Sequence, residues 1–183
     1  MPAHAQTSNA AVVAAGRRLL EERGTEALTM RDVADAVGVR TPSLYKRVRG
    51  RSDLLRLILE DVTDELTAAI DGVVGSGHPA ADLRAAMNAY RAFAHANPVT
   101  YALLNGPAAP EGAALRAQRS AATLMRLVTE LSGPRSALPA ARTLVAWANG
   151  FIGMELAGAF RLGGDVDDAW DFGLTRVLDA ISS

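Results

Sequence analysis

The stretch that decides the fold runs from Thr29 to Leu55 and reads TMRDVADAVGVRTPSLYKRVRGRSDLL. Thr29 with Asp32 three residues later forms a capping-box-like pair, which satisfies free backbone N–H groups at a helix start. Apolar residues then recur at helical spacing. Gly38 follows the last of them, where a chain leaving a helix takes a left-handed conformation that suits glycine. The pattern predicts a helix that ends in a turn at Gly38.

A second, short helix is predicted directly after this turn. Thr41 can cap it, and Pro42 suits its first position because proline lacks an N–H and its fixed φ fits a helix start. Leu44 and Val48 form its inward side. The outward side carries cations, hydroxyls and a phenol, which suit phosphate oxygens and base edges. We predict a helix-turn-helix with this segment as recognition helix, ended by Gly50 and followed by a third helix.

The distribution of charge agrees with a nucleic-acid partner when it is counted locally. Over the whole chain, 19 basic residues nearly cancel 20 acidic ones. Residues 1–60 hold ten Arg or Lys against seven Asp or Glu, whereas residues 61–183 hold nine against thirteen. From residue 40 to residue 56 there are six cations and one anion. Such a basic patch is typical of a protein that docks on a phosphate backbone. The alternative is an arginine-rich surface that only contacts solvent. The glycine turn and the helix caps favour the first interpretation.

The same stretch resembles the N-terminal DNA-binding domain of TetR-family transcriptional regulators. The residues that carry the resemblance are Gly16, Gly24, Leu28-Thr29, Val33-Ala34, Gly38-Val39, Ser43-Leu44-Tyr45 and Asp53-Leu54-Leu55. Two positions depart from the usual family pattern, since Val48 stands where the family has Phe and Arg51 where it has Lys. Val48 still fills a core position, and Arg51 keeps the charge.

The resemblance implies that Tyr45 and Arg51 hold DNA phosphates, and that residues of the second helix, Pro42 among them, face the major groove. With the neighbouring polar and basic side chains, the predicted DNA-binding residues are Thr29, Arg40, Thr41, Pro42, Ser43, Tyr45, Lys46, Arg47 and Arg51.

Composition sets the broad class of the protein. With 183 residues, 49% of them hydrophobic, the chain can bury a substantial core. We find no uncharged apolar run of the roughly 18 residues that a membrane span needs, and no signal peptide, so we expect a cytoplasmic protein without a membrane partner. The sequence contains no cysteine, which excludes disulfides and thiolate metal sites, and we expect no metal and no cofactor.

Helical periodicity recurs along the rest of the chain, so we predict an all-α protein. The predicted helices beyond the central stretch are 9–23, 81–96, 98–104, 112–131, 138–162 and 166–181. Glycines and a proline between Gly72 and Pro79 mark the clearest break. We therefore expect a helix-turn-helix domain over residues 1–52, a connecting helix over about 53–71, and a helical effector-binding and dimerisation domain over 72–183.

The segment 138–162 contains a ridge of small residues along one face. Ala146, Gly150, Gly153 and Ala157 follow helical spacing, and each glycine costs about 1 kcal/mol of helix propensity relative to alanine. We expect another helix to pack there, either across a two-fold dimer axis or from the same subunit. The predicted dimer interface comprises Ala146, Gly150, Gly153, Ala157, Trp170, Leu174, Val177 and Leu178.

The second domain resembles the C-terminal domain of one TetR subgroup in which a Trp and a His-Gly pair mark the penultimate helix. The cues are Asn97-Pro98-x-x-Tyr101 and Gly150-Phe151-x-x-Met154-Glu155-Leu156, with Asn149 where the subgroup has His. This resemblance implies a pocket for a small, mostly apolar effector. Its candidate lining residues, which could equally be core residues, are Met87, Tyr90, Phe93, Tyr101, Met125, Trp147, Asn149 and Phe151.

Together these observations predict a ligand-responsive repressor that binds a palindromic DNA operator as a homodimer. An effector that turns the two connecting helices would disturb the spacing of the recognition helices. An enzyme is disfavoured because the three histidines, His4, His78 and His95, do not pair at metal-ligand spacing and no phosphate-binding glycine motif is present. The other alternative is a helical protein-binding or structural module that keeps a helix-turn-helix shape without reading DNA.

Overall fold

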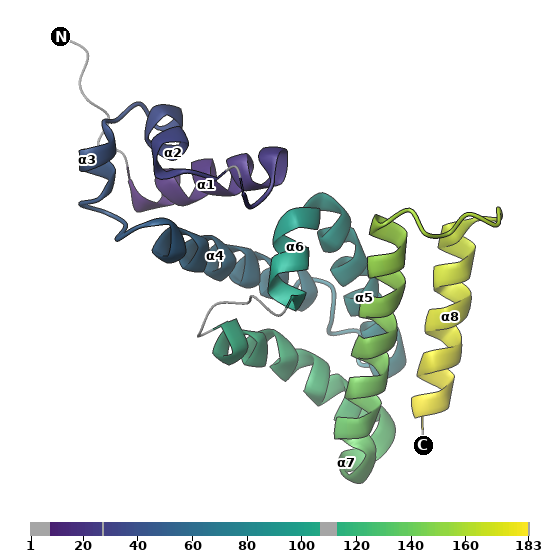
Figure 1. Ribbon diagram of the computed structural model, residues 1–183. Helices are drawn as coiled ribbons and strands as arrows, with labels where there is room; N and C mark the ends of the chain where they lie inside the picture. Colours follow the sequence, from purple (N-terminus) through teal and green to yellow (C-terminus); the bar gives the residue numbers. More distant parts are fainter. Residues whose placement is uncertain (1–7, 27, 107–112, 183) are drawn as a thin grey trace. The chain divides into compact units, whose positions relative to one another are not determined.

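The computed structural model describes residues 8–26, 28–106 and 113–182, with the backbone alone for 113–120. All regular secondary structure in these ranges is helical, which confirms the all-α prediction (Figure 1). The helices are α1 (Asn9–Arg23), α2 (Met30–Ala36), α3 (Thr41–Leu44), α4 (Arg51–Asp71), α5 (Pro79–Ala96), α6 (Pro98–Asn105), α7 (Ala113–Leu156) and α8 (Val166–Ile181). Over the described residues, none of these helices is long and apolar enough to cross a membrane.

The chain divides into two compact units. Unit 1 comprises Met1–Asp64 and Asn97–Arg116, and unit 2 comprises Glu65–Ala96 and Ala117–Ser183. Helix α4 therefore belongs to both units, and α6 belongs with the N-terminal helices although it follows α5 in the chain. This division differs from the predicted domain boundary near residue 72, which took account of local composition alone.

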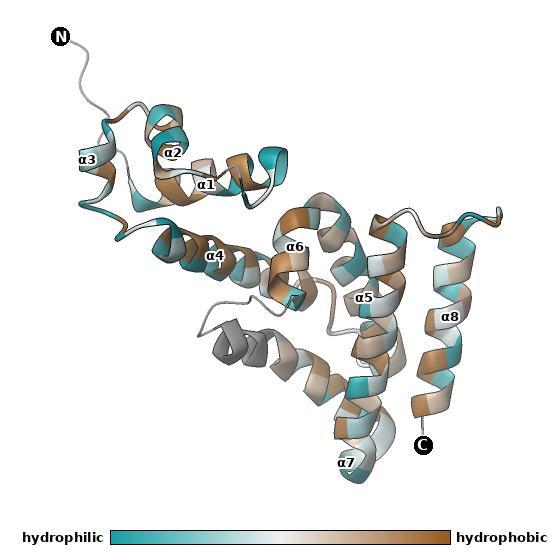
Figure 2. Ribbon diagram, in the orientation of Figure 1, coloured by the Kyte–Doolittle hydropathy of each residue, from teal (hydrophilic) through white to brown (hydrophobic). Residues whose placement is uncertain are grey.

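The core of unit 1 is built on apolar faces of α1, α2, α3 and α4. Figure 2 shows brown and pale or teal residues alternating along α4, as in an amphipathic helix. Gly16 of α1 lies so close to α4 that an added Cβ would come within 2.9 Å of Ile58 Cδ1 and 3.3 Å of Leu54 Cδ1. The buried side chains include Val12, Leu19, Leu20, Leu28, Met30, Val33, Leu44, Val48, Leu54, Ile58, Leu59 and Val62.

A carboxylate of α1 caps the start of α6. Glu21 accepts the backbone N–H of Val99 and that of Thr100, both at 2.9 Å, and the Thr100 hydroxyl at 2.7 Å. One turn earlier on α1, Arg17 donates to Asn97 Oδ1 at 2.6 Å. Free N–H groups at a helix start favour an anionic partner, so these bonds hold α6 within unit 1.

Helix α7 contains a break at Gly133, within the gap between the predicted helices 112–131 and 138–162. Gly133 has φ 72° and ψ 159°, which is not helical, and the second half of α7 covers residues 134–156. The predicted helix 138–162 therefore begins earlier and ends earlier than expected. Its end is set by Gly158 with φ 63°, which lets the Ala159 N–H reach the Met154 carbonyl at 2.9 Å.

Unit 2 is organised around Trp170 of α8, which is 1% exposed. Its indole N–H donates to Asn88 Oδ1 on α5 at 2.8 Å, and its ring lies 4.9 Å from Trp147 and 5.3 Å from Phe151 of α7. Gly173 makes room for Trp147, because a Cβ at Gly173 would lie 2.4 Å from Trp147 Cζ2. Aromatic packing thus joins α5, α7 and α8.

A half-buried ion pair braces the same three helices. Arg91 of α5 donates its Nε to Glu155 Oε2 at 2.9 Å, pairs with Asp167 Oδ1 at 2.7 Å, and lies over the Trp170 ring at 5.2 Å. The hydrogen bond from Arg91, ahead of one from His95, holds the pKa of Glu155 below its ordinary value. This pairing offsets the cost of partly removing the Arg91 and Glu155 charges from water.

We expect Gly173→Ala to destabilise unit 2. The added methyl meets the rigid Trp147 ring and should cost about 1–3 kcal/mol, more than the gain of about 1 kcal/mol in helix propensity. Thermal unfolding of the wild type, Gly173→Ala, Trp147→Leu and the double variant measures this. In the Trp147→Leu background the alanine should be tolerated, and equal losses in both backgrounds would contradict the explanation.

Candidate nucleic-acid interface

Helix α2 begins and ends as its sequence predicts. The Thr29 hydroxyl accepts the Asp32 N–H at 3.1 Å and donates to Asp32 Oδ2 at 2.5 Å, which forms a side-chain cap at the N-terminus. At the C-terminus Gly38 has φ 70°, and the Val39 N–H bonds to the Ala34 carbonyl at 2.9 Å. This arrangement turns the chain sharply into α3.

Helix α3 starts one residue earlier than predicted. Arg40 is the N-cap, in extended conformation, and its carbonyl accepts the N–H groups of Ser43 and Leu44, so Thr41 is the first helical residue and its side chain is not the cap. The regular helix ends at Leu44, not at Gly50. One further turn follows, in which Arg47 and Val48 donate to the Leu44 carbonyl at 2.9 and 3.1 Å.

Two apolar anchors hold this short helix, and its other side is open to solvent. Leu44 is fully buried and Val48 is 1% exposed, whereas Tyr45 is 52% exposed. Thr41 is half-buried. The remaining predicted DNA-binding residues of this segment are exposed, namely Arg40, Pro42, Ser43, Lys46 and Arg47.

The cations near α3 differ in how much their side chains are already engaged. Within the described residues, Arg40 and Lys46 make no side-chain hydrogen bond or ion pair, and Arg47 makes a long contact of 3.4 Å with Asn9 Oδ1. Arg51 donates its guanidinium to two backbone carbonyls, those of Leu28 and Thr25. The side chain of Arg51, which was predicted to contact a phosphate, therefore already has hydrogen-bond partners inside the protein.

Asp53 closes the turn between α3 and α4. Its carboxylate accepts the backbone N–H of Arg49 at 2.9 Å and the guanidinium of Arg56 at 2.8 Å, and Arg56 also pairs with Glu60. The bond from the Arg49 N–H, followed by that from Arg56, holds the pKa of Asp53 below its ordinary value. The ionised carboxylate thus stabilises the start of α4.

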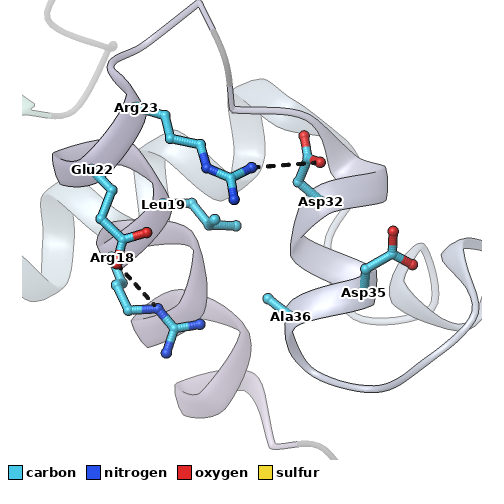
Figure 3. Close-up of a pocket in the computed structure, with 7 residues that line it drawn as sticks. All are labelled: Arg18, Leu19, Glu22, Arg23, Asp32, Asp35 and Ala36. Carbon is cyan, nitrogen blue, oxygen red and sulfur yellow. Dashed lines mark ion pairs between the residues drawn. The ribbon is translucent and has the colours of Figure 1, made fainter.

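A groove of about 390 Å³ lies on unit 1 between α1 and α2, and its side chains come from both helices (Figure 3). Arg23 pairs with Asp32 at 3.9 Å and Arg18 with Glu22 at 3.8 Å. Exposed pairs of this kind contribute little energy. Because its charges are matched, this groove lacks the unpaired positive charge that Arg40 and Lys46 place on either side of α3. Its lining residues are Arg18, Leu19, Glu22, Arg23, Asp32, Asp35 and Ala36.

Four of the predicted effector residues contact one another in two pairs. Tyr90 donates its hydroxyl to Asn149 Oδ1 at 2.7 Å, and the rings of Trp147 and Phe151 lie 5.7 Å apart. Met87 and Phe93 are buried in unit 2, Met125 is half-buried there, and Tyr101 is buried in unit 1.

A groove of about 570 Å³ in unit 2 has a different and more polar lining. It is lined by Asn88, Arg91, Ala92, His95, Glu155, Asp167, Trp170 and Asp171. The eight predicted effector residues are absent from this lining, so their role stays a prediction. In the described part of the chain, no group of three or more His, Asp or Glu side chains is arranged to hold a metal ion.

The predicted dimer residues fall into two sets. Trp170, Leu174 and Leu178 are buried within unit 2 at 1%, 0% and 4% exposure, because this side of α8 packs inside the unit, as the contacts of Trp170 with α5 and α7 illustrate. These three residues offer no surface to a second copy. The small residues of α7 are exposed, whereas Val177 is half-buried; the exposed set is Ala146, Gly150, Gly153 and Ala157.

The arrangement of α1 to α4 is that of a helix-turn-helix DNA-binding domain. Residues 12–58 match the family model described as "Bacterial regulatory proteins, tetR family", and residues 83–177 match the one described as "Tetracyclin repressor-like, C-terminal domain". The chain belongs to the TetR family of transcriptional regulators.

Individual relatives agree with this assignment. The HTH-type transcriptional regulator Mb1846 of Mycobacterium bovis is 33% identical over 105 residues, 55% of this chain and 44% of that relative, so the match spans less than half the relative's length. A protein of unknown function from Rhodococcus sp. RHA1 superposes with a TM-score of 0.81 and 26% identity over 100% of both chains. A TetR variant from Acinetobacter baumannii AYE, in complex with minocycline, shares the fold with a TM-score of 0.69 and 22% identity over 96% of this chain and 99% of that one.

The bonds of Asp53 predict a pH-dependent loss of stability in Asp53→Asn. A carboxyl with a lowered pKa stabilises the native state above its ordinary pKa, and this contribution disappears as the pH falls through the folded-state value. Urea unfolding should show Asp53→Asn about 0.5–1 kcal/mol less stable than wild type at neutral pH. The difference should shrink in acid.

The control variant is Asp35→Asn. It removes an exposed carboxylate 3.9 Å from Arg31 and should change the stability little. A gap for Asp53→Asn that is constant with pH would contradict the prediction.

Proposed function

We propose that this protein is a ligand-responsive repressor that binds a palindromic operator as a homodimer. The observation that carries the proposal is the outer side of α3, where exposed polar and basic side chains stand on the buried anchors Leu44 and Val48. Side chains that make no bond within the protein can meet a duplex without first breaking one. Occupying an operator is sufficient to block transcription, which favours repression over activation.

The chemistry of α3 divides naturally between base edges and phosphates. Thr41, Ser43 and Lys46 carry donors and acceptors that suit base edges in the major groove, and the Pro42 ring offers an apolar contact. Arg40, Tyr45 and Arg47 can donate to phosphate oxygens, which sets the position of the helix without reading sequence. Thr29 already caps α2, so its contribution is to fix the α2 start close to the duplex.

A second copy of the chain is needed because one short helix reads few base pairs. Two copies related by a dyad would place their recognition helices about 34–36 Å apart, one turn of duplex. The exposed ridge on α7 supports such pairing, since a Cβ at Gly150 or Gly153 would meet nothing within 4 Å in the protomer. Exposed Met154 and Phe172, at 50% and 66%, add apolar surface to α7 and α8.

Response to an effector is supported by family and by chain connectivity. A TetR protein of the same fold has been solved with minocycline bound, and we propose that unit 2 here takes a small, mostly apolar molecule. Helix α4 runs from unit 1 into unit 2. An effector that favours one conformation of unit 2 would therefore act on the recognition helices through α4 and lower operator affinity.

Duplex binding tests the function directly. Candidate operators are inverted repeats in the DNA upstream of the protein's own gene, and scrambled duplexes of equal length and composition serve as controls. We expect tighter binding to the cognate duplex and a steep loss of affinity as salt rises. Lys46→Gln should weaken binding, and Ser43→Ala should change the preference among base substitutions by about 1–3 kcal/mol. Equal affinity of the wild type for cognate and scrambled DNA would refute operator reading.

Sedimentation equilibrium tests the dimer with a matched pair of variants. Gly150→Glu places a charge on the exposed ridge without a clash in the protomer, so we expect a folded monomer at micromolar concentration, where the wild type is a dimer. Ala80→Glu, at an exposed site in the first turn of α5, introduces the same charge and should leave the dimer intact. A monomeric wild type would exclude the proposed assembly, and a dimeric Gly150→Glu would exclude this ridge.

A further inference from the structure

The guanidinium of Arg51 points back into unit 1. Its Nε donates to the Leu28 carbonyl at 3.1 Å, and its Nη2 donates to the Thr25 carbonyl. Both acceptors lie in the connection between α1 and α2. A guanidinium presents its donors in a rigid planar fork, so two acceptors at this spacing determine how the side chain lies.

These two bonds fix the segment that leads into α2. Leu28 is 1% exposed and directly precedes Thr29, whose hydroxyl caps the helix. Hydrogen bonds with a charged donor are stronger than neutral ones, and a phosphate would have to displace them to engage these same donors. Arg51 is thus placed to orient the start of α2.

Arg49 lies two residues earlier, in the turn between α3 and α4, and presents the opposite situation. Its backbone N–H is held by Asp53 at 2.9 Å, and Asp53 is held in turn by Arg56 at 2.8 Å. Its side chain is exposed and, within the described residues, makes no hydrogen bond or ion pair, although its charge interacts electrostatically with the Asp53 carboxylate. The backbone is therefore fixed while the guanidinium remains available.

We propose that Arg49 provides the phosphate contact at the α3–α4 turn and that Arg51 is a positioning residue that acts through the α1–α2 connection. The resemblance to the family assigns the phosphate to the position of Arg51, so this chain departs from that pattern. The inference rests on the proposed DNA-binding function. Arg49 gives up no hydrogen bond or ion pair within the protein when it meets a phosphate, whereas two of the five N–H donors of Arg51 are already engaged and orient its side chain toward the α1–α2 connection.

The salt dependence of duplex binding distinguishes the two roles. Each phosphate contact contributes about 0.9 to the slope of the logarithm of the binding constant against the logarithm of salt concentration. Arg49→Gln should reduce that slope by about 0.9 per half-site, weaken cognate and scrambled duplexes alike by about tenfold at low salt, and leave the unfolding temperature unchanged. The control Arg135→Gln removes an exposed cation of α7 and should change neither quantity.

Arg51 should behave differently in the same assay. At a temperature where every variant is fully folded, Arg51→Gln should lower affinity for the cognate duplex several-fold while its salt slope stays at the wild-type value. Arg51→Lys keeps the charge but loses the planar fork, so it should not restore affinity. A residue that matters only for global stability would leave the affinity of the folded protein unchanged. Both Arg51 variants should also unfold at lower temperature than the wild type.

Two results would overturn the proposal. One is an unchanged salt slope in Arg49→Gln. The other is a reduced slope in Arg51→Gln together with full affinity in Arg51→Lys, since that is the behaviour of a phosphate contact. Failure of the DNA-binding function itself is distinguishable, because the wild type would then bind no duplex at low salt and no slope could be measured for any variant.

Discussion

The structure of the proposed DNA-reading surface depends on the burial of Leu44 and Val48. Helix α3 has four residues, and a helix this short has no stability of its own in water. Two apolar side chains buried from solvent, one on α3 and one in the turn after it, supply the free energy that the few hydrogen bonds of this helix cannot. Because both anchors point into unit 1, the residues between and around them must face outward. The proposed interface for DNA is thus a consequence of core packing, and any change that loosens these anchors would move all of its exposed side chains together.

The local features of the helix-turn-helix could be predicted from the sequence, because their causes are local. The Thr29 cap, the positive φ of Gly38 and the break at Gly133 each follow from a few adjacent residues and appear where the patterns indicate. The start of α3 was missed by one residue, since Arg40 occupies the cap position without a side-chain bond. The end of α7 was missed because Gly158, inside a run that otherwise reads as helix, adopts a left-handed conformation.

Interactions between distant segments could not be predicted. The bonds from Glu21 to the start of α6 join residues 78 and 79 positions apart, and no local pattern marks them. Arg51 illustrates the same limit, because the sequence marks it as a cation at a helix start but does not show that it donates to the carbonyls of Leu28 and Thr25. The position of Trp170 in the apolar pattern of its helix fits an interface residue and a core residue equally well. Only its contacts with Asn88 and Trp147 show that it is a core residue of unit 2.

The stacking of Trp147 on Trp170 gives the molecule an internal optical probe. These are the chain's two tryptophans, their rings are 4.9 Å apart, and both belong to unit 2. Indole emission therefore originates from unit 2, whereas Tyr45 lies in unit 1 directly after α3. Tryptophan fluorescence of the unmodified protein can therefore follow unit 2 by itself, without any attached label.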